Sequence, residues 1–332
     1  MIIPVSTLGG SYDIVLERGA IKKTAEYIKI KQGCKVLVVT DSGVPQQYAK
    51  AVADSFSDAH IFTFEQGEKS KNFDTYKTIC EKLLELSFTR KDSVVAVGGG
   101  VVGDMVGFAA ATYMRGIDFY NIPTTVLSQV DSSIGGKTAI DLNKIKNIIG
   151  AFYQPKKVII DPDVLSTLPE RQIKNGLAES IKMGLNFDKA LFELFLKEDY
   201  LTHIEEIIER SLKVKKYVVE QDERESGLRK VLNFGHTIGH GIEAVKGDEL
   251  YHGECVALGM IPMCGEKVKE KLLIALKNVG LPTVACYDKD MVFEALCHDK
   301  KSVGDKVTVV RCEEAGSFTM SDVTFLEIKK LI

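Results

Sequence analysis

Short runs of β-branched and aromatic residues alternate with amphipathic stretches through the first half of the chain, and this alternation limits the fold more than any other feature. Five of these runs are predicted strands, at residues 35–40, 59–64, 92–97, 119–122 and 158–160. Helical periodicity lies between them, for example from Phe73 to Leu86. Continuous apolar strands separated by helices are typical of a parallel sheet that is covered on both faces.

The pattern changes near residue 165, where Leu168-Pro169-Glu170 has the form of a helix start. Two short strands at residues 307–310 and 317–320 precede a last helix. The helices predicted before them span residues 170–185, 189–197, 203–221, 229–245 and 253–277. We therefore predict an α/β N-terminal domain with a parallel sheet over residues 1–165 and a mainly α-helical C-terminal domain over residues 166–332.

Charge and cysteine usage argue against several classes of protein. The net charge of −3 and the pI near 6.1 argue against a nucleic-acid partner or an anionic membrane surface. The seven cysteines have no regular spacing, which predicts free thiols in a reducing compartment. The start of the chain does not resemble a secretory signal, and the apolar stretch from Val94 to Met114 contains three consecutive glycines and Asp104. We therefore expect a cytoplasmic protein without a membrane span.

A glycine-rich loop follows the third predicted strand and precedes a helix. The segment Gly98-Gly-Gly-Val-Val-Gly103 has the GxGxxG spacing of a dinucleotide-binding loop, in which backbone N–H groups bind a pyrophosphate. Asp41 ends an earlier strand and is a candidate for the ribose hydroxyls, although it could equally be a helix N-cap. Glycine-rich turns also occur for packing reasons, so the spacing alone favours nucleotide binding without establishing it.

Three of the six histidines lie within a short stretch. His236 and His240 are four residues apart on one predicted helix face, and His252 follows them. Clustered imidazoles with one carboxylate are typical of a zinc-type site that keeps an open position. Glu243 and Glu254 could supply the carboxylate, and the residues alone leave open whether His236 or His240 is the ligand.

Basic residues elsewhere could bind an anionic ligand. Lys137 and Thr138 end the segment Asp131-Ser-Ser-Ile-Gly-Gly-Lys-Thr138, which has Asp131 where an ATP-binding loop requires glycine. Further basic or amide residues that could hold phosphate or carboxylate groups are Lys146, Asn147, Lys182, Lys215 and Arg229. Each of them could also be a solvated charge or part of a helical ion pair, as Glu179 and Lys182 could be.

Several segments taken together resemble the 3-dehydroquinate synthase family of sugar-phosphate cyclases, and they run in order over almost the whole chain. The segments are residues 98–104, 107–116, 123–125, 129–138, 146–155, 176–182, 232–240, 252–257 and 299–301. The resemblance implies a phosphate-eliminating carbon–oxygen lyase of the shikimate pathway, which leads to chorismate and the aromatic amino acids. Its substrate would be 3-deoxy-D-arabino-heptulosonate 7-phosphate and its products 3-dehydroquinate and phosphate, with NAD regenerated in each turnover and Zn²⁺ or Co²⁺ as the metal.

The resemblance also implies site residues. The metal ligands would be Glu179, His236 and His252. Residues that would contact the substrate are Asp131, Lys137, Asn147, Lys182, Lys215, Arg229, Asn233, His240 and Lys300. Residues that would contact NAD are Asp41, Glu68, Lys71, Gly99, Gly100, Asp104, Thr124, Thr125, Lys137, Lys146 and Thr167. Arg115 would reach the phosphate site of a neighbouring subunit, which implies a homodimer.

Three alternative hypotheses compete with this interpretation. Another sugar-phosphate cyclase would form an inosose or a valiolone-type ring from a different phosphate. A metal-dependent polyol dehydrogenase shares the glycine-rich loop and the histidine ligands but would accumulate NADH and would not need the segments around Asp131 and Lys146. A non-catalytic metal- or nucleotide-binding module is the third.

Overall fold

The computed structural model describes residues 1–143, 145–300 and 306–332, without the side chains of residues 298–300. The chain divides into two compact units, Met1–Pro169 and Glu170–Ile332. The sequence alone places this boundary at residues 165/166, within the short helix η5 (Pro162–Thr167) of the first unit. Each unit is described below by itself.

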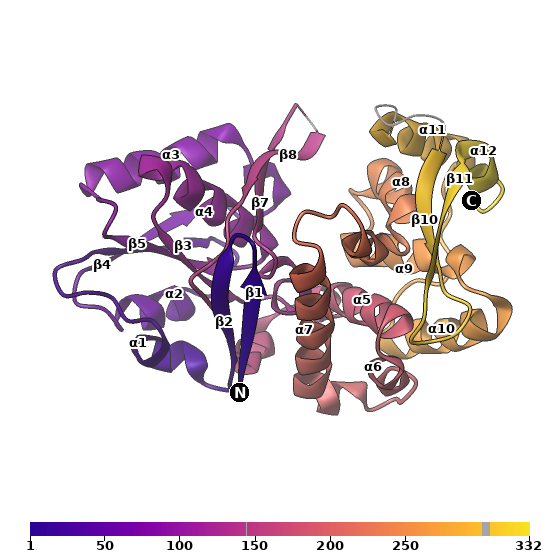
Figure 1. The fold of residues 1–332 in the computed structure, drawn as a ribbon, viewed down its shortest axis with the longest axis horizontal. Helices are drawn as coiled ribbons and strands as arrows, with labels where there is room; N and C mark the ends of the chain where they lie inside the picture. The colour runs from indigo at the N-terminus through magenta and orange to yellow at the C-terminus, as the bar shows by residue number, and fades with distance from the viewer. Residues whose placement is uncertain (144, 301–305) are drawn as a thin grey trace. The chain divides into compact units, whose positions relative to one another are not determined.

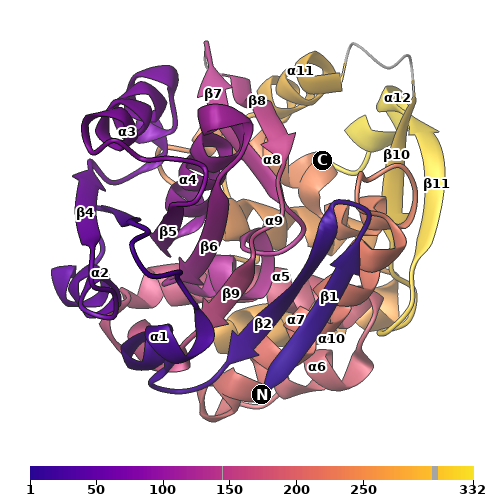
Figure 2. The ribbon, with the colours of Figure 1, turned by 60° about the vertical axis from the view of Figure 1, so that its left-hand side comes forward.

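A seven-stranded sheet forms the centre of the first unit, in the strand order β1-β2-β9-β6-β5-β3-β4. Its strands are β1 (Ile2–Thr7), β2 (Gly10–Leu16), β9 (Lys157–Ile160), β6 (Asp118–Pro123), β5 (Ser93–Gly98), β3 (Val36–Asp41) and β4 (Ala59–Phe64). Neighbouring strands are parallel except for the edge hairpin β1–β2, drawn in indigo in Figure 2. The predicted parallel sheet is confirmed. The prediction missed the edge hairpin, whose first strand contains Pro4, a residue that sheets accept at an edge.

Helices cover both faces of this sheet. Leu37 and Val39 pack into a core cluster with helices α3 (Phe73–Glu85) and α4 (Gly100–Thr112), whereas Val36 and Val38 face a second cluster that includes α2 (Gln46–Ala53). Figure 1 shows these helices on opposite sides of the strands. Successive strand residues point to opposite faces, so burial on both sides explains the uninterrupted apolar runs of the sequence.

The strand order reverses between β3 and β5. From β3 the chain first adds β4 on one side, then returns through α3 to place β5 on the other side of β3. In open α/β sheets a ligand binds at the carboxyl ends of the strands beside such a reversal. Asp41 ends β3 and Gly98 ends β5, so the predicted nucleotide residues lie at this edge.

A second hairpin, β7 (Lys137–Leu142) and β8 (Ile145–Phe152), belongs to the first unit and was not predicted from the sequence. Ile140 is buried in the cluster with α4, while Ile145, Ile148 and Phe152 of β8 are exposed. Adding a Cβ atom to Gly107 of α4 would place it 2.4 Å from Cγ2 of Thr138, so the hairpin and the helix pack closely.

The second unit is mainly helical, as predicted. Its helices are α5 (Glu170–Asn186), α6 (Lys189–Leu194), α7 (Ile204–Gln221), α8 (His236–Lys246), α9 (His252–Met260), α10 (Glu266–Val279), α11 (Lys289–Lys300) and α12 (Phe325–Lys329). An antiparallel hairpin, β10 (Lys306–Arg311) and β11 (Thr319–Thr324), precedes the last helix. Across the described ranges, no helix has the length and apolar character needed to cross a membrane.

Two predicted helices are interrupted in the structure. The helix predicted over residues 229–245 is wrong as one element, because the short helix η7 (Leu228–Asn233) ends before Gly235, which has a φ of 76°. The helix predicted over residues 253–277 breaks after α9, where η8 (Ile261–Met263) contains Pro262 and α10 starts anew after Gly265. Left-handed glycine and proline both end helices, whereas the apolar pattern continues through each break.

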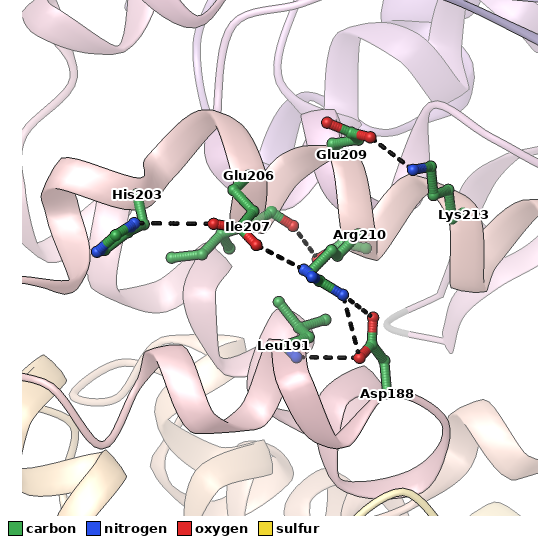
Figure 3. A network of polar contacts seen from close by, with 9 residues as sticks. Asp188, Leu191, His203, Glu206, Ile207, Glu209, Arg210 and Lys213 are labelled. Carbon is green, nitrogen blue, oxygen red and sulfur yellow. Dashed lines mark hydrogen bonds and ion pairs between the residues drawn. The ribbon is translucent and has the colours of Figure 1, made fainter.

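A polar network joins α6 to α7 (Figure 3). The Asp188 carboxylate accepts the N–H of Leu191 as the N-cap of α6 and also accepts a hydrogen bond from Arg210 at 3.1 Å. Arg210 additionally donates to Glu206 on its own helix at 2.8 Å. The carboxylate of Asp188 thus caps the start of α6 and also binds α7.

Candidate active site

Helices α8 and α9 of the second unit bring three histidines together. His236 is the first residue of α8, and His252 is the first residue of α9. A Cβ atom added to Gly259 would lie 2.0 Å from the carbonyl oxygen of Gly235, so the two helices touch backbone to backbone. This close approach places the rings of His236 and His252 5.2 Å apart, between centroids.

The buried carboxylate of Glu179 faces both rings. Glu179 lies on α5 and is only 1% exposed. Its Oε1 atom is 3.5 Å from Nε2 of His236 and 3.5 Å from Nε2 of His252. One potential ligand atom from each of these residues lies within 4.8 Å of the other two. Residues far apart in the sequence thus converge on one point.

The Nδ1 atom of each ring has a partner of its own, so that Nε2 is the nitrogen that faces Glu179. Nδ1 of His236 lies 3.1 Å from the carbonyl oxygen of Phe234, and Nδ1 of His252 lies 3.0 Å from Oε2 of Glu243. A backbone carbonyl or a carboxylate behind a histidine is the usual support of a metal-ligating imidazole. Neither oxygen of Glu179 accepts a well-formed hydrogen bond in the described part of the chain. Two imidazoles and a carboxylate with this support fit a divalent cation such as Zn²⁺.

Charge around the carboxylate agrees with this fit. Burial alone would raise the pKa of Glu179, but the Lys182 ammonium and the two imidazoles hold it well below its usual range. Burial and Lys182 lower the pKa of His236, which keeps this imidazole neutral as a ligand must be. Burial would also lower the pKa of His252, yet the neighbouring carboxylates of Glu179 and Glu243 outweigh burial and raise the pKa to about 9, so a metal ion that binds here must displace a proton from this ring.

His240 lies on the rim of the cluster. Its ring centroid is 5.1 Å from that of His236 and 5.9 Å from that of His252, and its side chain is exposed. His240 groups with Glu243 and His252 as a second possible set of cation ligands, but only His236 and His252 face the buried Glu179. This geometry favours His236 over His240 in the choice that the residues alone left open.

Three predicted substrate residues of the second unit are buried cations. Lys182 and Arg229 are each 2% exposed, and Lys215 is 6% exposed. The Lys182 ammonium donates to the carbonyl oxygen of Leu232 at 2.6 Å, and the Arg229 guanidinium donates to the carbonyl oxygen of Glu223. Burial of a cation is costly unless an anionic group offsets it, and for Lys182 that group is the carboxylate of Glu179.

One carboxylate beside the predicted residues, that of Glu225, is not marked by the sequence. Asn233, a predicted substrate residue, donates to Oε1 of Glu225 at 2.7 Å, and Glu225 has a φ of 60°. Glu243 was considered only as a metal ligand, whereas the structure places it behind His252. No motif marks Glu225, because its position follows from the backbone of the loop between α7 and η7.

The glycine-rich loop of the first unit begins α4 directly after β5. Added Cβ atoms would lie 3.1 Å from Cγ2 of Thr125 at Gly99 and 3.0 Å from Nδ2 of Asn121 at Gly103. The glycines thus let the start of α4 lie close to the neighbouring strand β6. The first-turn N–H groups of such a helix have no partner within the helix and can bind a phosphate.

Other predicted NAD residues surround this edge of the sheet. Thr124 follows β6 and donates its N–H to Gly98 at 2.9 Å. Thr167 lies within hydrogen-bonding distance of the Tyr48 hydroxyl at 3.0 Å. Asp41 is not an N-cap of α2, which begins at Gln46; its carboxylate accepts the N–H of Gly43 at 2.9 Å.

Lys71 is a predicted cofactor residue that joins another one, Asp104, to a predicted substrate residue, Asn147. Its ammonium donates to Asp104 at 2.6 Å and to Asn147 at 2.5 Å. Burial raises the pKa of Asp104 to about 6, although Lys71 opposes this effect. Asn147 stands at a φ of 55°, where its N–H donates to Asp141 at 2.7 Å.

The remaining predicted residues of the first unit differ in their exposure. Lys137, Lys146, Glu68 and Arg115 are exposed, whereas Asp131 and Gly100 are partly buried beside the start of α4. The side chain of Lys300 lies outside the described residues. In the first unit the structure therefore gathers Lys71, Asp104 and Asn147 into one network but leaves the exposed lysines at the surface.

Solved structures with the same fold define the class. One is 2-deoxy-scyllo-inosose synthase complexed with carbaglucose-6-phosphate, NAD⁺ and Co²⁺, with a TM-score of 0.91, 27% identity and coverage of 100% of this chain and 99% of that one. Another is 2-epi-5-epi-valiolone synthase from Streptomyces hygroscopicus subsp. jinggangensis 5008 with NAD⁺ and Zn²⁺, with a TM-score of 0.85, 26% identity and coverage of 96% and 95%. A probable glycerol dehydrogenase from Sinorhizobium meliloti 1021, with a TM-score of 0.67, 17% identity and coverage of 90% of both chains, shares the fold alone. Fold and site together place the chain among the sugar-phosphate cyclases.

Sequence comparisons narrow the class to a family. The 3-dehydroquinate synthase N-terminal model matches residues 61–175, and the C-terminal model matches residues 176–302. The 3-dehydroquinate synthase of Streptococcus pneumoniae (strain ATCC 700669 / Spain 23F-1) is 42% identical over 339 residues, covering 96% of both chains. That of Streptococcus mutans serotype c is 40% identical over 342 residues, covering 97% of this chain and 96% of the relative. The chain belongs to the 3-dehydroquinate synthase family.

Proposed function

We propose that this chain is an enzyme that converts 3-deoxy-D-arabino-heptulosonate 7-phosphate to 3-dehydroquinate and phosphate. The substrate and 3-dehydroquinate differ in their atoms only by one molecule of phosphoric acid, so the reaction consumes no net oxidant. The family match over nearly the full length supports the substrate. The observation that carries the chemistry is the convergence of Glu179, His236 and His252 on one point.

Glu179, His236 and His252 would hold a divalent cation, Zn²⁺ or Co²⁺, and the edge of the sheet in the first unit would hold NAD. When bound, NAD takes up a hydride from a ring carbon and returns it, while the cation acts as a Lewis acid toward the reacting hydroxyl groups. We assign NAD contacts in the first unit to Asp41, Glu68, Lys71, Gly99, Gly100, Asp104, Thr124, Thr125, Lys137, Lys146 and Thr167. We therefore assign NAD binding mainly to residues 1–165, and the metal and most of the substrate contacts to residues 166–332.

Buried cations of the second unit would bind the anionic ends of the substrate. Lys182, Lys215 and Arg229 are already desolvated, so little water has to be removed from them when a phosphate or a carboxylate binds. Their positions are fixed by surrounding backbone, as the bond from Lys182 to Leu232 shows. Such fixed charges orient the substrate and reduce the entropy that it loses on reaching a reactive geometry.

Proton transfer would fall to groups at the surface of the second unit. His240 is exposed beside the two ligand rings and can take a proton from a substrate hydroxyl through its imidazole. Asn233, held by Glu225, would orient the same part of the substrate. The other substrate contacts would be Asp131, Lys137 and Asn147 in the first unit and Lys300 in the second.

We further propose that the enzyme is a cytoplasmic homodimer. Arg115 is exposed just after the end of α4, where a second subunit could contact it. Exposed Ile145, Ile148 and Phe152 give β8 an apolar surface of the kind that a second subunit covers. Sedimentation of the purified protein tests the dimer, and a monomer at micromolar concentration would refute it.

The test supplies the heptulosonate phosphate with a catalytic amount of NAD and follows both phosphate and NADH absorbance. Release of phosphate without lasting NADH supports the synthase. Lasting NADH with a simple polyol would identify the dehydrogenase instead, and turnover of a different sugar phosphate would identify another cyclase. Removal of metal by a chelator should stop phosphate release, and Zn²⁺ or Co²⁺ should restore it.

A further inference from the structure

One face of helix α5 contacts three successive residues at the start of α9. Arg171, Asn175 and Glu179 are spaced by four residues and therefore lie on the same side of the helix. Glu179 faces His252 at 3.5 Å, as described above. The other two residues of this face bind the two residues that follow His252, so the face works as a clamp on the first turn of α9.

Asn175 holds the backbone next to His252. Its Oδ1 atom accepts the N–H of Gly253 at 2.6 Å, and Asn175 is 6% exposed. A Cβ atom added to Gly253 would lie 2.0 Å from the carbonyl oxygen of Asn175, so no larger residue fits between the helices. The first N–H groups of a helix have no partner within the helix, and Asn175 supplies a partner for one of them.

Arg171 binds Glu254 and also the segment that precedes α9. Its guanidinium donates to both oxygens of Glu254, at 2.8 and 2.7 Å, and to the carbonyl oxygen of Glu249 at 2.6 Å. The same group lies 4.2 Å from the centre of the Tyr251 ring. Glu254 in turn accepts the N–H of Tyr251 at 2.8 Å, which closes the capping box of α9. A two-bonded arginine–carboxylate pair fixes direction as well as distance.

We propose that Arg171 and Asn175 are positioning residues for the metal centre, which hold the first turn of α9 so that Nε2 of His252 faces Glu179. This inference rests on the proposed metal site. Glu243 fixes the ring of His252 from behind, but a ring can be directed only as well as its backbone is held. Loss of an outer partner of a metal ligand typically weakens metal binding about 10- to 100-fold.

The experiment measures Co²⁺ affinity of metal-free protein by competition with a chelating dye, together with the visible absorption of the bound ion. Arg171→Met and Asn175→Ala should each weaken Co²⁺ binding about 10- to 100-fold and alter the absorption. Lys174→Met is the matched control, because Lys174 lies on the same helix and pairs with Glu170 at 2.6 Å, also on α5. The control should bind Co²⁺ like the parent protein, and thermal unfolding of each metal-free variant checks that it is folded.

A double substitution separates a positioning role from a general loss of packing. If Arg171 acts through Glu254, then Arg171→Met combined with Glu254→Gln should weaken Co²⁺ binding no more than the stronger single change. Fully additive losses would overturn the proposal. Should Arg171→Met fail to fold, Arg171→Lys decides the question, because lysine keeps the charge but not the two parallel bonds: a clear loss supports the proposal, and parental affinity overturns it. A parent protein that binds no Co²⁺ refutes the metal site itself, whereas a parent that binds with unaffected variants refutes only the clamp.

Discussion

The loop between α7 and η7 depends on one carboxylate, and Asp222→Asn tests this dependence. Asp222 accepts hydrogen bonds from the N–H groups of Ser226, Gly227 and Arg229, at 2.9, 2.7 and 3.0 Å. Burial alone would raise the pKa of Asp222, but these N–H groups hold it at about 2. The same bonds fix the backbone of Arg229, a proposed substrate residue.

The size of the effect follows from the pKa. A fall from 3.8 to about 2 corresponds to roughly 2 kcal/mol, because one pKa unit is worth about 1.4 kcal/mol. Screening by nearby solvent reduces the expected value to about 1 to 2 kcal/mol. Since the folded pKa lies below the unfolded one, this contribution is complete above about pH 4 and is lost as the pH falls toward 2. Asp222→Asn should therefore cost the full amount at pH 7 and only about half of it at pH 3.

Urea unfolding at several pH values between 7 and 3 measures this difference in the free energy of unfolding. Circular dichroism serves as the signal, because the chain has no tryptophan whose fluorescence could report unfolding. The matched control is Glu209→Gln on α7, which removes an exposed ion pair with Lys213 and should change the free energy of unfolding by less than about 0.5 kcal/mol. Asp222→Asn should also raise KM more than it lowers kcat, because Arg229 loses its support. An equal cost at every pH, or none at pH 7, would refute the reasoning.

Three further substitutions test the site. His252→Ala should abolish turnover and weaken metal retention while leaving the fold largely intact, as metal analysis and circular dichroism would show; normal turnover with a full complement of metal would rule this ligand out. Lys137→Ala should slow phosphate release with only a modest loss of NAD affinity, and an unchanged rate would remove Lys137 from the substrate site. Gly259→Ala should destabilise the protein by about 1 to 3 kcal/mol and lower metal affinity, because its methyl group would meet the carbonyl oxygen of Gly235 at 2.0 Å; parental unfolding and affinity would show that α8 and α9 do not need this contact.

The hydrophobic pattern of the sequence predicted a strand correctly where the strand is buried on both faces. The runs at residues 35–40 and 92–97 are strands because they are covered on both faces, and their apolar character is visible without any partner. The hairpin β7–β8 was missed, because most of β8 is exposed and the two strands carry polar residues such as Lys137 and Asn147. Two helices were predicted as continuous across Gly235 and Pro262, where the structure interrupts them. The apolar pattern continues through both positions and does not indicate where the backbone turns.

The sequence by itself determined the parallel α/β half, the helical half, the glycine-rich loop and the crowding of histidines near residue 240. Residue spacing alone could not choose between His236 and His240, since both lie on one face of α8, one turn apart, and it was the family resemblance that implied His236. Only the tertiary structure decided which imidazole faces Glu179, because that carboxylate arrives from α5, far away in the sequence. The support behind His252 from Glu243, Asn175 and Arg171 was equally invisible, because distances between helices depend on how glycine backbones pack and not on any local pattern.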